Sequence, residues 1–305
     1  MSKFIIILIL FINSSYCLNL TVHDSDNPSA SHILDAEIID EILIVPGMVG
    51  GIEFYDISNR EILNHLSNLQ LSQGGGGGST KPNCVIAKDD YLYVTTNQGL
   101  GIVNISNPSS PQYLGIVSGT NGYILENLDI YENFLAIAAH EDGVLFYDIS
   151  NPDDPQYIHT YSTVNAWAVQ LEAFPDHPNY EFVIYVADHE SINIGAYQYY
   201  SNYHHFDGID NLYIGSAVKD IAYGNGLVYF ATGSGGVDVY LAEGTLDVGD
   251  IIFDCSMHNL CYLDNYNTSV LANRIEVFNN KLAVSDWDDV EILEWNGNSL
   301  ELIGY

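Results

Sequence analysis

Gly143-Val-Leu-Phe-Tyr-Asp-Ile-Ser-Asn151 is the third occurrence of one phrase in this chain of 305 residues. The earlier copies are Gly51-Ile-Glu-Phe-Tyr-Asp-Ile-Ser-Asn59 and Gly99-Leu-Gly-Ile-Val-Asn-Ile-Ser-Asn107, so successive copies start 48 and 44 residues apart. A repeat of this period is typical of one supersecondary unit that cannot bury its apolar face alone. We therefore expect the copies to stack on one another.

Each copy follows a short run rich in β-branched and aromatic residues and a tight polar turn, which together predict a hairpin. Equivalent runs continue beyond the third copy and give six units: Ile42–Val45, Tyr91–Thr95, Phe134–Ala138, Phe182–Ala187, Leu227–Thr232 and Lys281–Ser285. In copies two and three a fourth strand follows a link bounded by prolines. Four antiparallel strands in about 45 residues match one propeller blade. The predicted fold is all-β, a six-bladed β-propeller of four-stranded antiparallel blades.

The pattern also resembles a known family. Leu135-Ala-Ile-Ala138, then Gly143, Asp148-Ile-Ser-Asn-Pro152 and Pro155-Gln-Tyr157, resembles the LVIVD repeat family of secreted and surface proteins. Copy two matches similarly, copy one matches through its Asp-Ile-Ser-Asn, and copies four to six match in strand pattern alone. The resemblance implies a β-propeller and brings no catalytic residues, because the family is defined by a structural repeat.

The termini and the repeats predict the domain organisation. Lys3 followed by the apolar run Phe4 to Ile12 is typical of a secretory signal peptide over residues 1–17, with lipid attachment at Cys17 as the alternative. An N-terminal extension would cover residues 18–32, and its Leu18–Val22 could add a strand where the ring closes. The propeller would cover residues 33–305, with approximate blades at 33–72, 82–118, 124–162, 166–206, 216–252 and 270–305. Localisation would be secreted, periplasmic or at the cell surface.

The net charge of the chain limits the kinds of molecule that it can bind. Forty acidic and seven basic residues give a formal net charge of −33. Such a surface repels phosphate backbones, so we expect no nucleic-acid partner, and no later segment is apolar enough to span a membrane. Two interpretations of the acids remain open: solubility of an exported monomer, and local carboxylate clusters that bind Ca²⁺. We expect no required cofactor, with Ca²⁺ as a possible ligand.

Three cysteines lie beyond the predicted signal peptide. Cys255 and Cys261 flank a short loop, and a disulfide between them is the favoured interpretation in an exported chain. A zinc site would need ligands beyond the nearby His258. Cys84 is expected as a small buried side chain in an inner strand.

In a propeller the hairpin tips between second and third strands share a face with the links between blades, and ligands usually bind there. The predicted tips are Pro46–Met48, Thr96–Gln98, His140–Asp142, Asp188–Glu190, Thr232–Ser234 and Asp286–Asp289. Acids and histidines concentrate in three of them. Hard oxygen ligands suit Ca²⁺, and the histidines suit a transition metal. The candidate cation ligands are His140, Glu141, Asp142, Asp188, His189, Glu190, Asp286 and Asp288.

Aromatic and basic residues should reach the same face from the links between blades. The candidate ligand-face residues are Tyr123, Glu126, Trp167, Lys219, Arg274 and Trp287. Lys219 and Arg274 would neutralise the acidic rim, and a tryptophan there either stacks on a sugar or fixes a loop.

No catalytic motif occurs in the sequence, neither a Gly-x-Ser-x-Gly elbow nor a His-Glu-x-x-His helix nor a nucleotide fingerprint. We therefore expect a non-catalytic binding or scaffold module whose acidic loop face contacts a protein, glycan or cation. The alternative is a Ca²⁺-dependent hydrolase or lactonase with its site at the channel mouth.

Overall fold

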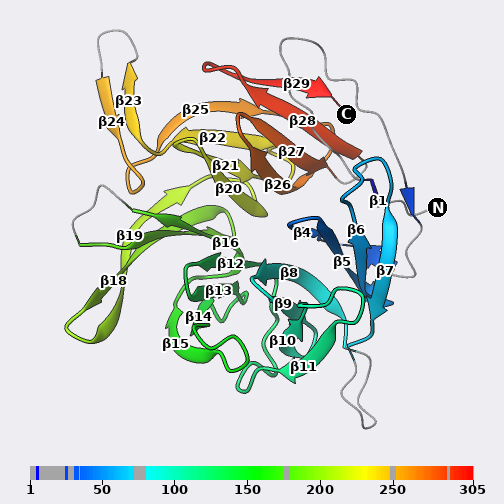
Figure 1. Cartoon of the computed structure of the whole chain (residues 1–305). Coiled ribbons are helices and arrows are strands. Elements are labelled where there is room, and N and C mark those ends of the chain that lie inside the picture. The colour runs from blue at the N-terminus through cyan, green and yellow to red at the C-terminus, as the bar shows by residue number, and fades with distance from the viewer. Residues whose placement is uncertain are drawn as a thin grey trace. The chain divides into compact units, whose positions relative to one another are not determined.

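The computed structural model describes residues 5–6, 25–26, 31–33, 35–71, 80–174, 179–247, 252–286 and 289–304. Every regular element within these ranges is a β-strand (Figure 1). None of the described residues lies in a helix that is long and apolar enough to cross a membrane. The predicted signal peptide and Leu18–Val22 fall almost entirely outside the described residues.

In the described chain six sheets of four or five strands follow one another along the sequence, and in each the strands pair mainly in sequence order (Figure 1). Blade one contains β4 (Glu37–Ile39), β5 (Ile42–Val49), β6 (Gly51–Asp56) and β7 (Asn64–Leu69), with β3 (Ser31–Ile33) added beside β5. Blade two contains β8 (Pro82–Lys88), β9 (Tyr91–Thr96), β10 (Gly99–Asn104) and β11 (Gln112–Ile116). Blade three contains β12 (Leu128–Tyr131), β13 (Phe134–Ala138), β14 (Val144–Asp148) and β15 (Gln156–Tyr161).

Blade four has the longest strands, and blade five carries an insertion. Blade four contains β16 (Ala166–Ala173), β17 (Phe182–Asp188), β18 (Ser191–Tyr200) and β19 (Tyr203–Tyr213). Blade five contains β20 (Asp220–Gly224), β21 (Leu227–Ala231), β22 (Val237–Leu241) and β25 (Cys261–Tyr266), and blade six contains β26 (Ala272–Phe278), β27 (Lys281–Asp286), β28 (Asp289–Trp295) and β29 (Leu300–Gly304). Two-stranded sheets are formed by β1 (Ile5–Ile6) with β2 (Ser25–Asp26) and by β23 (Gly244–Asp247) with β24 (Ile252–Cys255).

The fold class is that of a six-bladed β-propeller with four-stranded antiparallel blades, which confirms the prediction. The chain divides into two compact units. Unit 1 holds blades one and two, chiefly within Leu20–Leu128, together with Asp148–Gln156. Unit 2 holds most of blade three and all of blades four to six, chiefly within Asp129–Tyr147 and Tyr157–Tyr305.

The repeated phrase has a local structural cause. Its Asp or Asn ends the third strand and accepts a hydrogen bond from the amide two residues on: Ser58 N–H donates to Asp56 at 2.8 Å, and Ser150 N–H donates to Asp148 at 2.8 Å. Asn104 does the same for Ser106 at 3.1 Å, so Asn replaces Asp without loss of the turn. This Asx turn directs the chain out of the third strand and toward the fourth.

The glycine that opens the phrase is required by close approach. Gly143 has φ +80°, and a Cβ there would lie 2.4 Å from the carbonyl oxygen of Tyr161 at the end of β15. Gly51 is equivalent, with φ +88° and a similar clash with the Leu69 carbonyl at the end of β7. Only glycine therefore lets the start of the third strand touch the end of the fourth.

Within unit 2 the core lies between consecutive blades. All seven residues of β17 are buried, and alternate side chains belong to different clusters. Ile184 shares a cluster with Phe146 of blade three, while Tyr185 shares one with Phe230 of blade five. Because strand side chains alternate between faces, a second strand that is apolar throughout is what a blade stacked on both sides requires.

The structure differs from three predicted boundaries. Pro46–Met48 is not a tip, because β5 continues to Val49, where β3 pairs with Val49 and Gly47. Blade four extends to Tyr213, beyond the predicted 206, because β18 and β19 form one long hairpin. The outer strand of blade five is β25 rather than a strand before residue 252, because the hairpin β23–β24 is inserted between β22 and β25.

Candidate functional site

In unit 2 the hairpin tips of blades three, four and five hydrogen-bond to the segment that leads into the next blade. The tip residue His140 and Ala166, the first residue of β16, exchange two backbone hydrogen bonds of 3.0 and 2.9 Å. Gly233 and Ala272 form the same pair between blades five and six, at 3.1 and 3.0 Å. The carbonyl of His189 accepts from Val218 N–H at 2.9 Å. The predicted sharing of one face by tips and links therefore exists within unit 2.

His140 fixes the tip of blade three. It has φ 50°, and its Nδ1 lies 3.1 Å from Oδ1 of Asn165 in the link. The imidazole meets Trp167 edge to face, with ring centroids 4.9 Å apart. Glu141 and Asp142, in the same tip, are exposed. The histidine thus contributes to the loop structure, while the two acids face solvent.

Trp167 is the extra residue of a β-bulge. Ala166 pairs with Asp188 and Ala168 pairs with Ala187, so Trp167 has no partner in the register and its side chain is redirected. Lys219 Nζ lies 3.8 Å from the centroid of the Trp167 ring. This cation–π contact occupies one face of the indole, which favours the loop-fixing role over an open sugar platform.

Asp188 is a structural acid. It is 2% exposed, and its carboxylate accepts hydrogen bonds from Val164 N–H at 3.1 Å and from Asn165 N–H at 2.5 Å. It therefore caps the link into its own blade. The next two tip residues, His189 and Glu190, are exposed, and His189 has φ 61°.

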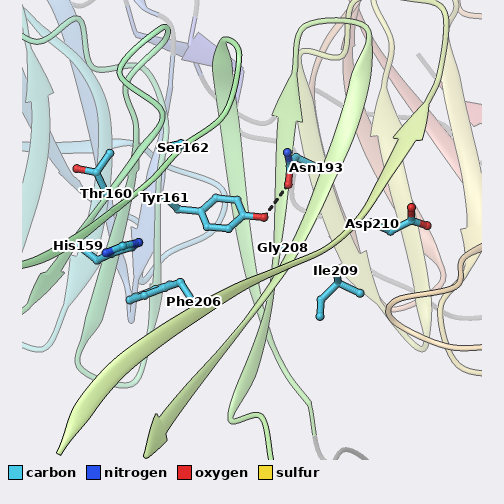
Figure 2. Close-up of a pocket in the computed structure, with 9 residues that line it drawn as sticks. All are labelled: His159, Thr160, Tyr161, Ser162, Asn193, Phe206, Gly208, Ile209 and Asp210. Carbon is cyan, nitrogen blue, oxygen red and sulfur yellow. Dashed lines mark hydrogen bonds between the residues drawn. The ribbon is translucent and has the colours of Figure 1, made fainter.

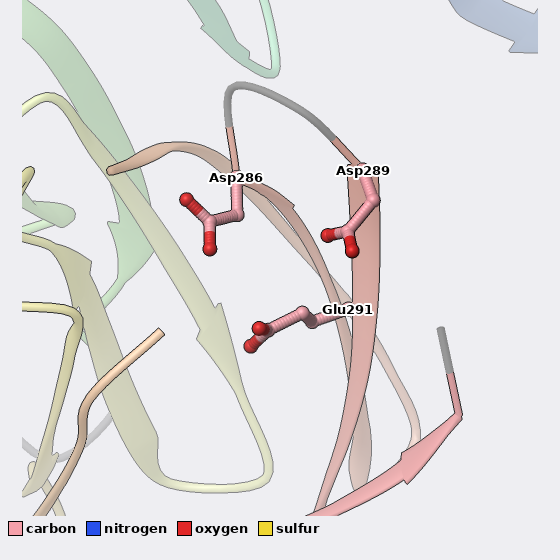
Figure 3. A group of neighbouring side chains, drawn as sticks. All are labelled: Asp286, Asp289 and Glu291. Atoms are coloured by element: carbon pink, nitrogen blue, oxygen red, sulfur yellow. The ribbon is translucent and has the colours of Figure 1, made fainter. Parts of the chain in front are cut away.

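The tip of blade six brings three carboxylates together (Figure 3). One carboxylate oxygen each from Asp286, Asp289 and Glu291 lies within 4.8 Å of the others. Asp286 is fully buried and accepts from Ser269 Oγ at 2.8 Å, from Val270 N–H at 2.7 Å and from Leu271 N–H. Burial, together with the neighbouring Asp286 and Asp289 charges, raises the pKa of Glu291 above its ordinary value.

The sequence prediction identified this tip and missed two of its three acids. Asp289 and Glu291 are the first and third residues of β28, so they point to the same side of the strand. This two-residue spacing is the sequence signal that could have identified both acids. Asp288 and Trp287 lie outside the described residues. The acids and histidines of the tips of blades three and four are not part of such a three-residue group in the described chain.

The predicted basic residues have separate partners. Arg274 Nη1 lies 3.7 Å from Asp220 Oδ1, and Asp220 Oδ2 also accepts from Ile275 N–H at 3.0 Å. Two other predicted ligand-face residues, Glu126 and Tyr123, lie in unit 1. Glu126 Oε2 accepts from Asn83 Nδ2 at 3.0 Å, and the Glu126 carbonyl accepts from Thr95 Oγ1 at 3.1 Å. Tyr123 lies in the same link, before β12, and is partly buried.

Two further acids lie on inner strands of unit 2. Asp129 accepts from Leu171 N–H at 2.5 Å and from Gln170 Nε2 at 3.1 Å, and the same Nε2 lies 2.9 Å from Glu172 Oε1. Burial raises the pKa of Asp129 to about 7 and that of Glu172 to about 7. These carboxyls therefore titrate near neutral pH.

A groove of about 570 Å³ lies beside the outer strand of blade three and the outer half of blade four (Figure 2). His159 stacks on Phe206 with centroids 4.6 Å apart, and Tyr161 Oη donates to Asn193 Oδ1 at 2.7 Å. None of the predicted ligand-face residues lines this groove.

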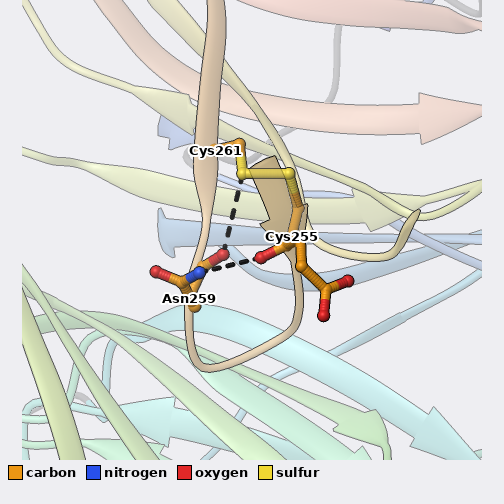
Figure 4. Close-up of a disulfide and its surroundings, with 4 residues drawn as sticks. Cys255, Asn259 and Cys261 are labelled. Carbon is orange, nitrogen blue, oxygen red and sulfur yellow. Dashed lines mark hydrogen bonds between the residues drawn. A yellow bond between two sulfur atoms is a disulfide. The ribbon is translucent and has the colours of Figure 1, made fainter. Parts of the chain in front are cut away.

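Cys255 and Cys261 are joined by a disulfide (Figure 4). It closes the turn that follows the inserted hairpin, and within that turn Met257 is 2% exposed and belongs to the core between blades four and five. Asn259 Nδ2 donates to the carbonyl of Asp254 at 2.9 Å. Cys84 is buried and not part of a disulfide, and its thiol donates to Asp35 Oδ2 at 2.9 Å.

The sequence comparison supports the repeat assignment. The family model described as LVIVD repeat matches residues 80–118 and 125–163, which contain blades two and three. The chain contains LVIVD repeats. The resemblance stated from copies two and three is therefore confirmed, and the structure extends the same four-stranded unit to the unmatched blades. No curated protein matches the sequence.

Solved structures show the same fold at low identity. A hypothetical selenium-binding protein from Sulfolobus tokodaii is similar at 12% identity, with a TM-score of 0.61 over 86% of this chain and 74% of that one. The computationally designed Ika8 protein is similar at 13% identity, with a TM-score of 0.55 over 91% of this chain and 89% of that one. At these identities the similarity concerns the fold alone.

Proposed function

We propose that this LVIVD-repeat propeller is an exported, non-catalytic binding module whose acidic hairpin tips contact a basic segment of a partner protein. The observation that carries the proposal is that two neighbouring tips each combine a residue that fixes the loop with exposed acids. In each tip one residue fixes the loop, His140 in blade three and Asp188 in blade four. The acids beside them, Glu141, Asp142 and Glu190, are exposed.

The two tips are attached to one link, which supports a common surface. His140 hydrogen-bonds to Ala166, and Asp188 accepts from Val164 and Asn165, so both tips contact the same three consecutive residues at the start of β16. Fixed loops lose little conformational entropy on binding, which favours affinity. A net charge of −33 would steer a basic partner toward such a surface and repel an acidic one.

Export is part of the proposal, and the disulfide supports it. A bond between Cys255 and Cys261 persists where thiols are oxidised, as in secreted, periplasmic and surface proteins. The Ca²⁺-dependent hydrolase remains the alternative function. It predicts turnover of ester or lactone substrates that is lost on chelation, whereas the binding module predicts no turnover with or without calcium.

The test compares two triple charge reversals that change the formal net charge of −33 by the same six units. The tip variant carries Glu141→Lys, Asp142→Lys and Glu190→Lys, and the control carries Glu41→Lys, Glu61→Lys and Asp154→Lys, all at exposed positions. The probe is a lysine-rich peptide, with affinity measured by calorimetry at physiological salt.

We expect the tip variant to bind the peptide at least about tenfold more weakly than the control, because local rather than total charge decides affinity. Thermal melting verifies that both variants fold. Equal weakening in both variants would reduce the interaction to non-specific attraction and refute the proposal, as would an absence of peptide binding by the unmodified chain.

A further inference from the structure

The two buried carboxylates of the blade-six tip, those of Asp286 and Glu291, accept hydrogen bonds from neighbouring groups of the described chain. The donors to Asp286 are one hydroxyl and two backbone amides, and the donor to Glu291 Oε1 is the amide of Ser269 at 3.1 Å. All of these donors are electrically neutral. Two buried carboxylates beside a third are therefore held together against their mutual repulsion.

Among the residues that the structure describes, one buried carboxylate oxygen at this site has no hydrogen-bond partner. Glu291 is 4% exposed, and its Oε2 is buried and accepts no hydrogen bond. Figure 3 shows the Glu291 side chain extending from β28 on the same side as Asp289 and toward Asp286. A buried carboxylate oxygen without a partner carries a desolvation cost that a bound cation would remove.

We propose that Asp286, Asp289 and Glu291 form a Ca²⁺ site. Two oxygens bound to one Ca²⁺ at about 2.4 Å can be at most about 4.8 Å apart. The observed spread of the three carboxylate oxygens, within 4.8 Å, therefore fits one ion. Asp289 is exposed, so water can enter and complete the six to eight oxygen ligands that Ca²⁺ accepts.

The chemistry of the group selects the kind of metal. All three ligands are carboxylates, which suit hard cations, and the group includes neither histidine nor cysteine. Mg²⁺ demands closer and more regular octahedral geometry and gives up its water reluctantly, so an open site on a hairpin end favours Ca²⁺ over Mg²⁺.

Ion binding would also strengthen the attachment of the tip. Asp286 holds Val270 and Leu271, and Glu291 holds Ser269, so both buried ligands already contact the link into β26. An ion that binds this arrangement, and not the unfolded chain, must raise the melting temperature. The site uses none of the acids assigned to partner binding in the tips of blades three and four.

The experiment titrates CaCl₂ into the chelator-treated full chain by calorimetry at fixed ionic strength, with MgCl₂ as a parallel titrant. We expect one saturable Ca²⁺ site, weaker binding of Mg²⁺, and a higher melting temperature with Ca²⁺. Glu291→Gln and Asp289→Asn should each weaken Ca²⁺ binding at least tenfold. Glu141→Gln and Asp142→Asn are the matched controls and should leave it unchanged.

Absence of saturable binding by the folded, unmodified chain at millimolar Ca²⁺ would overturn the assignment. Unchanged affinity in both Asp289→Asn and Glu291→Gln would also overturn it, because the ion would then bind elsewhere. Asp289 is exposed, so its variant tests the site even if a change at the buried Glu291 impairs folding. Lysine-rich peptide binding should survive Asp289→Asn, which separates this result from failure of the proposed function.

Discussion

Replacing Asp188 should destabilise the protein rather than only alter its surface. The carboxylate is 2% exposed and accepts from two amides, those of Val164 and Asn165. Hydrogen bonds to a charged acceptor contribute about 1.5–3 kcal/mol each. Val164 is 74% exposed, so water can replace the carboxylate at its amide. We therefore expect Asp188→Ala to cost about 2–4 kcal/mol in unfolding free energy.

The assay is equilibrium unfolding in guanidinium chloride, with thermal melting as a second probe. At about 2–4 °C per kcal/mol for a unit of this size, a loss of about 2–4 kcal/mol should lower the melting temperature by about 4–16 °C. Asp188→Asn keeps one acceptor oxygen and should lose less. The exposed Asp142→Ala is the matched control and should stay within about 0.5 kcal/mol of the unmodified chain. A loss for Asp188→Ala no larger than for Asp142→Ala would refute the capping role.

Three other outcomes are expected. Burial raises the pKa of Asp129 in the folded state to about 7, which is higher than its value in the unfolded chain. The contribution of Asp129 to stability is therefore complete below about pH 4 and is lost as the pH rises toward 7. The loss approaches about 1.4 kcal/mol per pH unit, so the stability of Asp129→Asn relative to the unmodified chain should rise over that range in urea titrations. Gly143→Ala should cost at least about 2 kcal/mol or abolish folding, since its Cβ would meet the Tyr161 carbonyl at 2.4 Å, and unchanged circular-dichroism melting would contradict this. Replacing Cys255 and Cys261 by Ser should cost about 2 kcal/mol in the same melting assay, with reductant reproducing the effect only in the unmodified chain.

The fold was accessible from sequence because the signals that define a blade are local. The Asx turns at Asp56, Asn104 and Asp148 and the tight glycines recur in the sequence because each blade needs them at the same place. The failures also have local causes. Pro46 stands inside β5 because β3 pairs beside it, and nothing in a single sequence indicates that pairing.

The candidate site could be predicted only in part, because the sequence of a hairpin tip gives its residue types but not the burial of their side chains. Asp188 and Glu190 are both acids of one tip, yet the first caps a link and the second faces solvent. That difference depends on where the preceding link passes, which is a tertiary property. Glu291 was missed because it lies within a strand, although its two-residue spacing from Asp289 places the two on one side.

Hydrogen–deuterium exchange of the full chain, with and without a saturating lysine-rich peptide, tests the binding-module proposal most directly. We predict that the peptide slows exchange in residues 139–143 and 188–191, where the exposed acids lie, and leaves the outer strand β11 unchanged. Protection confined to outer strands, or none in either tip at saturation, would contradict the assignment of these tips as the binding surface.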